Sequence, residues 1–221
     1  MTVHIPVLEK ITKANDQIAG INRAQLDRHR ILGLNLLASP GAGKTTLIER
    51  TLPLLGRELR VGVIEGDLAT NLDAERVIAV GAPCVQVHTG SCHLDASMVR
   101  DALERLPLPE LDVLLVENVG NLICPATFAL GTHFNVLLAS VPEGHDKPYK
   151  YPSMYRAVDL LLVNKMDLLP FVPFDMQLFR KGVEALNENL ETLPLSCLSG
   201  AGIESWVDWV RSRAQKQFAA L

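Results

Sequence analysis

The sequence predicts an α/β fold in which a mostly parallel central sheet is covered by helices on both faces. Three observations predict it. Short apolar segments of strand length alternate along the chain with stretches of helical periodicity. These short segments are apolar at nearly every position, which is typical of strands that are buried on both faces. The polar motifs follow directly after strands, at the edge where parallel sheets gather their ligands.

Length and composition fit one such domain. The chain has 221 residues, of which 48% are hydrophobic, and this is enough to build a buried core. We expect two parts. Residues 1–30 form an N-terminal helical segment packed on the core, and residues 31–221 form the α/β domain itself.

The first predicted element is a helix over Val7–Arg30. Its apolar residues recur at spacings of three and four, which places them on one side of a helix. They are Leu8, Ile11, Ala14, Ile18 and Ile21. Because this helix precedes the first strand, we expect the apolar stripe to pack on the edge of the core or to meet a partner.

Strands and helices then alternate along the rest of the chain. The predicted strands are Ile31–Ala38, Val61–Glu65, Cys84–His88, Val113–Glu117, Asn135–Val141, Leu160–Val163 and Leu193–Leu195. The predicted helices are Lys44–Leu55, Leu72–Val80, Leu94–Leu106, Phe174–Asn187 and Ile203–Phe218. This alternation is typical of parallel sheets that are built from strand–helix–strand units.

Charge and hydropathy argue against two classes of partner. The formal net charge is −4, so bulk charge does not indicate nucleic-acid binding. No apolar run approaches the roughly 18 residues of a membrane span, and no signal peptide is evident. Four cysteines in a chain of this size do not indicate a disulfide framework. We therefore expect a soluble, cytoplasmic protein without nucleic-acid or membrane partners, whose thiols are free or bind metal.

A phosphate-binding motif follows the first predicted strand. Residues 38–46 read "ASPGAGKTT", close to the pattern G-x-x-x-x-G-K-S/T, with Ala38 at the place of the leading glycine. Gly41 and Gly43 let the backbone turn its amides toward a phosphate. We expect Lys44 to reach the β- and γ-phosphates and Thr45 to bind Mg²⁺. The predicted loop comprises Pro40, Gly41, Ala42, Gly43, Lys44, Thr45 and Thr46.

Two later motifs predict guanine as the base. Residues 163–167 read "VNKMD" and contain N-K-x-D, which resembles the guanine-specificity motif of GTPases. A carboxylate at Asp167 can accept hydrogen bonds from guanine N1–H and N2–H₂, donors that adenine lacks. We expect Asn164 to steady the loop and Lys165 to stack over the base. Residues 195–202, "LSCLSGAG", resemble a loop whose amides meet guanine O6, here at Ser196, Cys197 and Leu198. Cys197 is then structural rather than reactive.

Acidic motifs end the second and fourth predicted strands, "EGDLAT" and "ENVGN". Asp67 and Glu117 are the carboxylates available to a magnesium ion at the phosphate loop, and the N–H of Gly120 can donate to a γ-phosphate. A helix N-cap is the alternative role of Asp67. No glutamine follows Gly120 to orient water, so we expect slow GTP hydrolysis of the kind suited to a switch. The predicted catalytic set is Lys44, Thr45, Asp67, Glu117 and Gly120.

A cysteine–histidine pair and a third cysteine predict a metal site. Cys92 and His93 follow the third predicted strand and Cys124 follows the fourth, so both loops leave the same edge of the sheet. Thiolate and imidazole ligands suit Zn²⁺ or Ni²⁺, and three of them leave a position for water, a substrate group or a second subunit. Asp95 is expected to support this site or cap a helix. Alternatively, Cys92 is a small buried residue and His93 begins a helix.

Cys124 lies four residues beyond Gly120, so phosphate contacts can move one ligand relative to the others.

These motifs together resemble one family, the hydrogenase nickel-insertion GTPase HypB. The similar stretches read "LNLLASPGAGKTTL", "GDLATNLDAER", "TGSCHLDASMV", "LLVENVGNLICPA", "PEGHDKPYKYP" and "LLVNKMDLLP". The resemblance covers nearly all of the chain and implies a SIMIBI-class P-loop GTPase that dimerises with GTP and helps to load nickel into nickel–iron hydrogenase. It also implies that Cys92, His93 and Cys124 form a zinc or nickel site at the dimer interface. The implied partners are a second copy of the chain, a nickel-delivery protein of the HypA type and the hydrogenase large subunit.

The chain departs from some family members near its N-terminus. Its first cysteine is Cys84, and only His4 and His29 precede the phosphate loop, so it has neither an N-terminal cysteine motif nor a His-rich tract. A high-affinity nickel site is therefore not expected there. One alternative is the urease accessory nickel GTPase, in which a Cys-Pro-His arrangement replaces the adjacent Cys92 and His93. Others are a chaperone GTPase for cobalamin enzymes, a nucleotide-switched metal-binding regulator and an ATP-dependent kinase.

Overall fold

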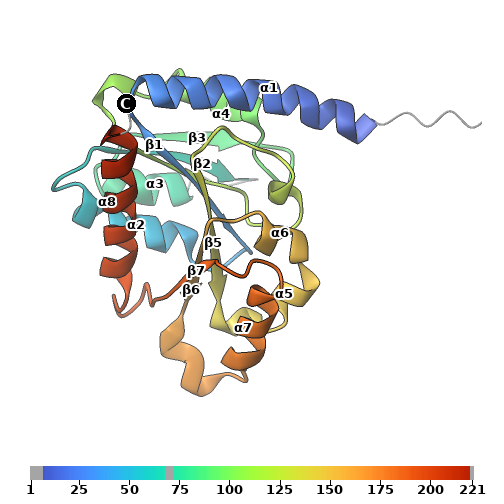
Figure 1. Cartoon of the computed structure of the whole chain (residues 1–221). Helices are drawn as coiled ribbons and strands as arrows, with labels where there is room; N and C mark the ends of the chain where they lie inside the picture. Colours follow the sequence, from blue (N-terminus) through green and yellow to red (C-terminus); the bar gives the residue numbers. More distant parts are fainter. Residues whose placement is uncertain (1–6, 68–71, 220–221) are drawn as a thin grey trace, which may run out of the picture.

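The computed structural model describes residues 7–67 and 72–219, and its centre is a seven-stranded sheet (Figure 1). The strands are β1 (Leu32–Ala38), β2 (Val61–Asp67), β3 (Cys84–His88), β4 (Val113–Glu117), β5 (Phe134–Ser140), β6 (Leu160–Asn164) and β7 (Glu191–Pro194). They lie in the order β3-β2-β4-β1-β5-β6-β7. Every neighbouring pair in this sheet is parallel. The predicted α/β class is therefore confirmed.

Helices cover both faces of the sheet. They are α1 (Val7–Arg28), α2 (Lys44–Leu55), α3 (Leu72–Ala79), α4 (Ala96–Leu103), α5 (Lys147–Lys150), α6 (Pro152–Arg156), α7 (Met176–Glu184) and α8 (Ile203–Ala219). Successive residues of a strand point to opposite faces. On β4, Leu115 packs with the core residues of α2 and α8, whereas Leu114 packs with those of α1 and α4. On β5, Leu137 packs with α6 and α7.

Several predicted boundaries are wrong by two or three residues. The helix predicted over Leu94–Leu106 is α4, which begins at Ala96 because the Asp95 side chain accepts a hydrogen bond from Met98 N at 2.9 Å. Asp175 likewise caps α7, which is shorter than the predicted Phe174–Asn187. Helices α5 and α6 were not predicted, because four or five residues are too few to show helical periodicity.

The buried face of α1 is not the predicted apolar stripe. Ala14 and Ile21 are exposed, and the side chains of Leu8 and Ile11 lie outside the described residues. The face that packs on the domain instead carries Asn15, Ala19, Asn22 and Leu26. Asparagine can be buried here because its amide hydrogen-bonds backbone groups of the neighbouring segments. Hydrophobic spacing thus identified the helix but not the side of it that packs.

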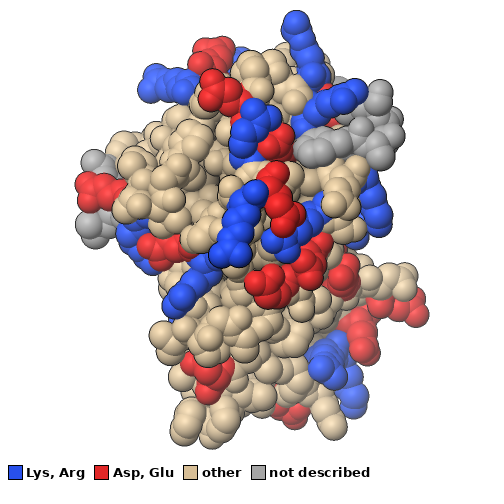
Figure 2. Space-filling model, turned by 90° about the vertical axis from the view of Figure 1, so that its left-hand side faces the viewer, with Lys and Arg blue, Asp and Glu red and all other residues tan. Residues whose placement is uncertain are grey.

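Charged side chains of both signs are interspersed on the side of the molecule that carries α8 (Figure 2). Arg211, on α8, pairs with Glu58 at 3.3 Å and with Asp208 at 2.9 Å. Exposed pairs of this kind add little to stability, and the visible face presents mixed charge rather than a patch of one sign.

Among the described helices, none is both long and apolar enough to cross a membrane.

A buried histidine joins β1 to α1. His133 Nδ1 accepts a hydrogen bond from the Gly33 N–H at 2.9 Å, and its Nε2 lies 2.9 Å from Asp27 Oδ1. Burial lowers the pKa of His133, although the neighbouring Asp27 opposes this. A proton on Nδ1 would also break the bond from Gly33. The folded protein therefore holds this imidazole neutral.

His133→Gln is expected to reduce the loss of unfolding free energy that the protein shows as the pH falls below 7. The unfolded chain protonates this histidine near pH ~6.5, whereas the folded chain does so only at a lower pH. The unfolded state thus binds more protons as pH falls through this window, and stability is lost with a slope of up to about 1.4 kcal/mol per pH unit. Urea unfolding at pH 7 and at acid pH measures this slope. An equal slope in the variant would show that another group is responsible.

Candidate functional site

The phosphate loop connects β1 to α2 at the carboxyl edge of the sheet. Gly41 and Gly43 have φ angles of +74° and +106°, a left-handed conformation that favours glycine. A side chain at Gly43 would also come within 2.6 Å of Asn164 Nδ2, so none fits there. The loop borders a cavity of about 470 Å³, whose lining includes Pro40, Gly41, Gly43, Lys44, Thr45 and Thr46. The predicted loop residues other than Ala42, which is buried, thus line one cavity.

Lys44 and Thr45 meet the buried carboxylate of Glu117. Thr45 Oγ1 donates to Glu117 Oε1 over 3.0 Å, and Lys44 Nζ lies 3.9 Å from the same oxygen. Burial raises the pKa of Glu117 to about 7, while the Lys44 charge and the Thr45 hydrogen bond oppose the rise. Among the described residues, Glu117 Oε2 has no hydrogen-bond partner. A hydroxyl beside a carboxylate with a free oxygen fits Mg²⁺, which prefers oxygen ligands.

The sequence interpretation missed a second carboxylate beside Glu117. Glu65 is its neighbour across the sheet, because β2 and β4 pair in register at these two residues. Glu65 is only 2% exposed, and within the described part of the chain its Oε2 has no partner. Burial, followed by the negative charge of Glu117, raises the pKa of Glu65 to about 8. Oxygens of Glu65, Asp73 and Glu117 lie within 4.8 Å of one another, so Glu65 and Asp73 join the candidate cation ligands.

Asp67 lies at the end of β2 and lines the same cavity. Its role as a magnesium ligand stays a prediction. The rest of the "EGDLAT" motif, residues 68–70, lies outside the described residues. The signal that could have revealed Glu65 is that two acidic motifs end neighbouring strands, but it can be read only once the strand register is known.

Gly120 lies against the phosphate loop. A side chain at this position would come within 3.0 Å of the Pro40 backbone, so glycine allows the close approach. Gly120 also lines the cavity beside the phosphate loop. It is therefore placed to contact a phosphate that enters the cavity, as the sequence predicts, and donation by its N–H stays a prediction.

The predicted base-recognition motif touches the phosphate loop directly. Asn164 Nδ2 donates to Ala42 O at 2.8 Å, and Asn164 Oδ1 accepts from Cys197 N at 3.0 Å. Asn164 thus ties two loops together, which is the steadying role expected of it. Lys165 Nζ donates to Gly41 O at 2.7 Å, and the Lys165 backbone is left-handed, with φ +60°. Stacking of Lys165 over a base stays a prediction.

Asp167 is oriented by the last loop of the sheet. Ser196 Oγ donates to Asp167 Oδ1 and accepts from Ser199 N at 3.1 Å. Cys197 is buried, and burial raises the pKa of its thiol to about 11, which fits the predicted structural role. Leu198 is 77% exposed beside it. The structure therefore brings the two predicted base motifs together, while guanine recognition itself stays a prediction.

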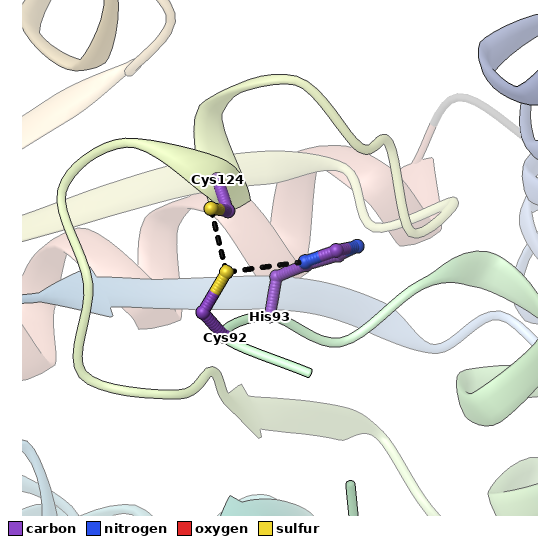
Figure 3. Close-up of side chains that lie close together, drawn as sticks. All are labelled: Cys92, His93 and Cys124. Atoms are coloured by element: carbon purple, nitrogen blue, oxygen red, sulfur yellow. Dashed lines mark hydrogen bonds between the residues drawn. The ribbon is translucent and has the colours of Figure 1, made fainter. Parts of the chain in front are cut away.

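Cys92, His93 and Cys124 meet as predicted (Figure 3). The first two lie on the β3 loop (residues 89–95) and the third on the β4 loop (residues 118–133). The two sulfur atoms are 2.6 Å apart, and Cys92 Sγ lies 3.9 Å from His93 Nδ1. The hydrogen bond to Cys124 raises the pKa of the Cys92 thiol, whereas burial lowers the pKa of His93 and favours the neutral imidazole that binds metal. This donor set fits Zn²⁺ or Ni²⁺.

Hydrogen bonds join the β3 loop to the segment around Gly120, which lines the cavity beside the phosphate loop. Leu94 N donates to Asn118 Oδ1 at 3.0 Å, and Asn121 Nδ2 donates to Cys92 O at 3.1 Å. Asn118 and Asn121 flank Gly120 in the sequence. Asparagine side chains of the segment beside the phosphate loop are therefore hydrogen-bonded to the backbone that carries two of the candidate metal ligands.

The sequence of this chain is similar to those of known proteins over most of its length. A family model described as "CobW/HypB/UreG, nucleotide-binding domain" matches residues 34–194. The hydrogenase maturation factor HypB of Escherichia coli K12 is 45% identical over 214 residues, which are 96% of this chain and 72% of that protein. The chain belongs to the HypB family of hydrogenase maturation factors. The HypB of Azotobacter vinelandii is 47% identical and matches 91% of this chain and 67% of its own length.

Solved structures of HypB have the same fold. The HypB of Archaeoglobus fulgidus is 35% identical, with a TM-score of 0.86 over 91% of this chain and 99% of that one. The HypB of Helicobacter pylori, solved in complex with nickel, is 33% identical, with a TM-score of 0.88 over 92% of this chain and 96% of that one. The signal recognition particle receptor FtsY of Elizabethkingia anophelis, 17% identical with a TM-score of 0.52, shares the fold alone. The predicted HypB resemblance and P-loop GTPase fold are confirmed.

Proposed function

We propose that this chain binds and hydrolyses GTP, and that the nucleotide controls a Cys/His metal site used in nickel insertion into nickel–iron hydrogenase. The observation that carries the proposal is that one short segment serves both sites. Glu117 ends β4 in the nucleotide cavity, Gly120 lies against the phosphate loop, and Cys124 contacts Cys92. A change at the γ-phosphate can therefore alter the position of a metal ligand.

The nucleotide chemistry follows from the side chains in the cavity. Lys44 offsets phosphate charge, Thr45 and Glu117 hold Mg²⁺, and Asp167 selects guanine. Mg²⁺, when bound, supplies positive charge that stabilises the phosphates. The residue after Gly120 is Asn121, whose amide is already bonded to Cys92 O, so it does not orient water in the way a catalytic glutamine does. Slow hydrolysis is the expected consequence.

The Cys/His site is proposed to carry nickel and to be completed by a second copy of the chain. Two thiols and one imidazole leave a coordination position that a second copy of the chain can complete, so GTP-dependent dimerisation would change the site. Family membership and the nickel complex of the Helicobacter pylori relative support nickel as cargo, and the ligand chemistry also accommodates zinc. The proposed partners are a nickel-delivery protein of the HypA type and the hydrogenase large subunit.

A second target is supported by one relative. The protein of Helicobacter hepaticus named hydrogenase/urease maturation factor HypB is 34% identical over 97% of this chain and 90% of its own length. Urease is therefore a second candidate for the enzyme that receives the nickel. Nickel transfer to each purified apoenzyme distinguishes the two.

Removing both thiols tests the proposal. Ni²⁺ and Zn²⁺ are titrated into the native chain and into a Cys92→Ala, Cys124→Ala variant, with GDP and with a non-hydrolysable GTP analogue. We expect at least about tenfold weaker metal binding in the variant, because two of three ligands are lost, and a nucleotide-dependent affinity in the native chain alone.

Cys84→Ala is the matched control, because this partly buried thiol lies in β3 outside the three-ligand cluster. Equal metal affinity in the native chain and the double variant would contradict the site. Equal affinity with GDP and the GTP analogue would contradict the coupling and leave the site standing. Multiple GTP turnovers separate a GTPase from a regulator that only binds nucleotide.

A further inference from the structure

The start of α4 and the β4 loop, two segments next to the candidate metal ligands, are both hydrogen-bonded to α1. Asn15 Oδ1 accepts a hydrogen bond from Ala96 N at 2.9 Å, and Asn15 Nδ2 donates to Ala129 O at 2.8 Å. Asn22 Nδ2 donates to Ala96 O at 2.8 Å and to Leu130 O at 2.9 Å. Ala96 is the first residue of α4 and directly follows the β3 loop, whereas Ala129 and Leu130 lie on the β4 loop. One face of α1 thus bridges the start of α4 and the β4 loop.

These bridges lie next to the metal ligands. The His93 ring stacks on Phe128, with centroids 4.0 Å apart and planes 20° apart. Phe128 immediately precedes Ala129, and Ala96 comes three residues after His93. Asn15 therefore connects the start of α4 to the β4 loop close to the place where the stacked rings connect the β3 and β4 loops.

The asparagine amides are well suited to fix a separation. Asn15 is 7% exposed and Asn22 is fully buried, so water does not offer their partners an easy replacement. Asn15 uses its oxygen on the start of α4 and its nitrogen on the β4 loop, so movement of either segment breaks one of these hydrogen bonds. Asn22 repeats the bridge about two helical turns further along α1.

α1 also lies close against the β4 loop beyond Asn22. A side chain at Gly131 would come within 2.4 Å of Ala19 O, and Gly131 has a left-handed φ of +93°. Arg23 Nε donates to Gly131 O at 2.9 Å. In Figure 1, α1 runs beside α4 across the top of the domain. The contact therefore continues along the helix rather than depending on one residue.

We propose that Asn15 is a positioning residue for the metal site: it ties the start of α4, three residues after His93, to the β4 loop and so holds His93 beside the two thiols. The inference rests on the proposed function, since it requires the Cys/His cluster to bind metal. Asn15 does not line the nucleotide cavity. Its loss should therefore alter metal binding and leave nucleotide affinity unchanged.

Asn15→Asp tests this role. The aspartate keeps an acceptor for Ala96 N at the N-terminus of α4, where negative charge is favourable, but it loses the donor to Ala129 O and releases the β4 loop. Binding of Co²⁺, measured by competition with a chelator, should weaken by about tenfold or more. The thiolate charge-transfer band should remain while the ligand-field bands change, because His93 is displaced. Affinity for GTP should equal that of the native chain.

Leu26→Ala is the matched control. Leu26 is a buried α1 residue that packs in the core, so its truncation lowers the melting temperature without removing either bridge. Similar Co²⁺ affinity losses in Leu26→Ala and Asn15→Asp would reduce Asn15 to a general stability role and overturn the inference. Should Asn15→Asp not fold, Asn15→Ser takes its place, because the shorter side chain also breaks the bridge. A Co²⁺ affinity loss larger than that of Leu26→Ala would support the inference, and a similar loss would overturn it.

A cysteine variant separates this inference from the proposed function. If Cys92→Ala abolishes Co²⁺ binding while Asn15→Asp binds like the native chain, the inference fails and the metal site stands. If Cys92→Ala also binds Co²⁺ like the native chain, the metal site itself fails. Weaker binding in both variants, with altered ligand-field bands in Asn15→Asp, is the expected result.

Discussion

Lys44→Ala is expected to weaken GTP binding by roughly a thousandfold. Lys44 is the buried cation of the cavity, 8% exposed and 3.9 Å from Glu117. Two charge-assisted hydrogen bonds to phosphate oxygens, each worth about 2 kcal/mol, correspond to about 4 kcal/mol, and each ~1.4 kcal/mol is a tenfold change in affinity. The variant also removes the positive charge of Lys44 from Glu117, which disfavours the carboxylate form that is proposed to bind Mg²⁺.

Titration with a fluorescent GTP analogue measures this loss, and multiple-turnover phosphate release measures the loss of hydrolysis. Lys181→Ala is a suitable control, because Lys181 is an exposed lysine on α7 and its removal changes the net charge equally. Native affinity and turnover in Lys44→Ala would contradict the phosphate-loop assignment. A similar loss in Lys181→Ala would instead indicate a long-range charge effect.

The phosphate loop and the parallel sheet could be predicted from the sequence because their signals are local. Gly41, Gly43 and Lys44 stand within one short stretch, and a strand must precede them and a helix must follow. The Cys92, His93 and Cys124 cluster needed one further step. Parallel strands send their loops to the same edge, so two loops far apart in sequence were expected to meet.

Glu65 and the packing face of α1 could not be predicted, for two physical reasons. Glu65 becomes a partner of Glu117 only through the register of β2 and β4, which no local pattern contains. The buried face of α1 uses Asn15 and Asn22, whereas a search for hydrophobic spacing assumes that buried residues are apolar. Polar side chains that satisfy loop backbone groups pass unnoticed in such a search.

Asp167→Asn is expected to weaken GTP binding by roughly a hundredfold and to create affinity for xanthosine triphosphate. In the proposed complex the carboxylate accepts two hydrogen bonds from guanine, and its replacement by an amide is expected to cost about 3 kcal/mol. Xanthine carries a carbonyl where guanine carries its amino group, so the new amide can donate to it. Competition of GTP, ATP and xanthosine triphosphate for a fluorescent nucleotide measures all three affinities in one series.

The gain of xanthine affinity is the decisive part of this experiment, because a damaged loop lowers affinity for every nucleotide. Asp167 is held by the Ser196 hydroxyl, so Asp167→Asn also weakens a contact between two loops. Ser196→Ala removes that contact and keeps the carboxylate, and it should cost GTP affinity only a few-fold, about 1 kcal/mol. If Asp167→Asn and Ser196→Ala lose GTP equally and neither gains xanthine affinity, Asp167 orders the loop and another group reads the base. If only Asp167→Asn exchanges guanine for xanthine, its carboxylate contacts the base directly.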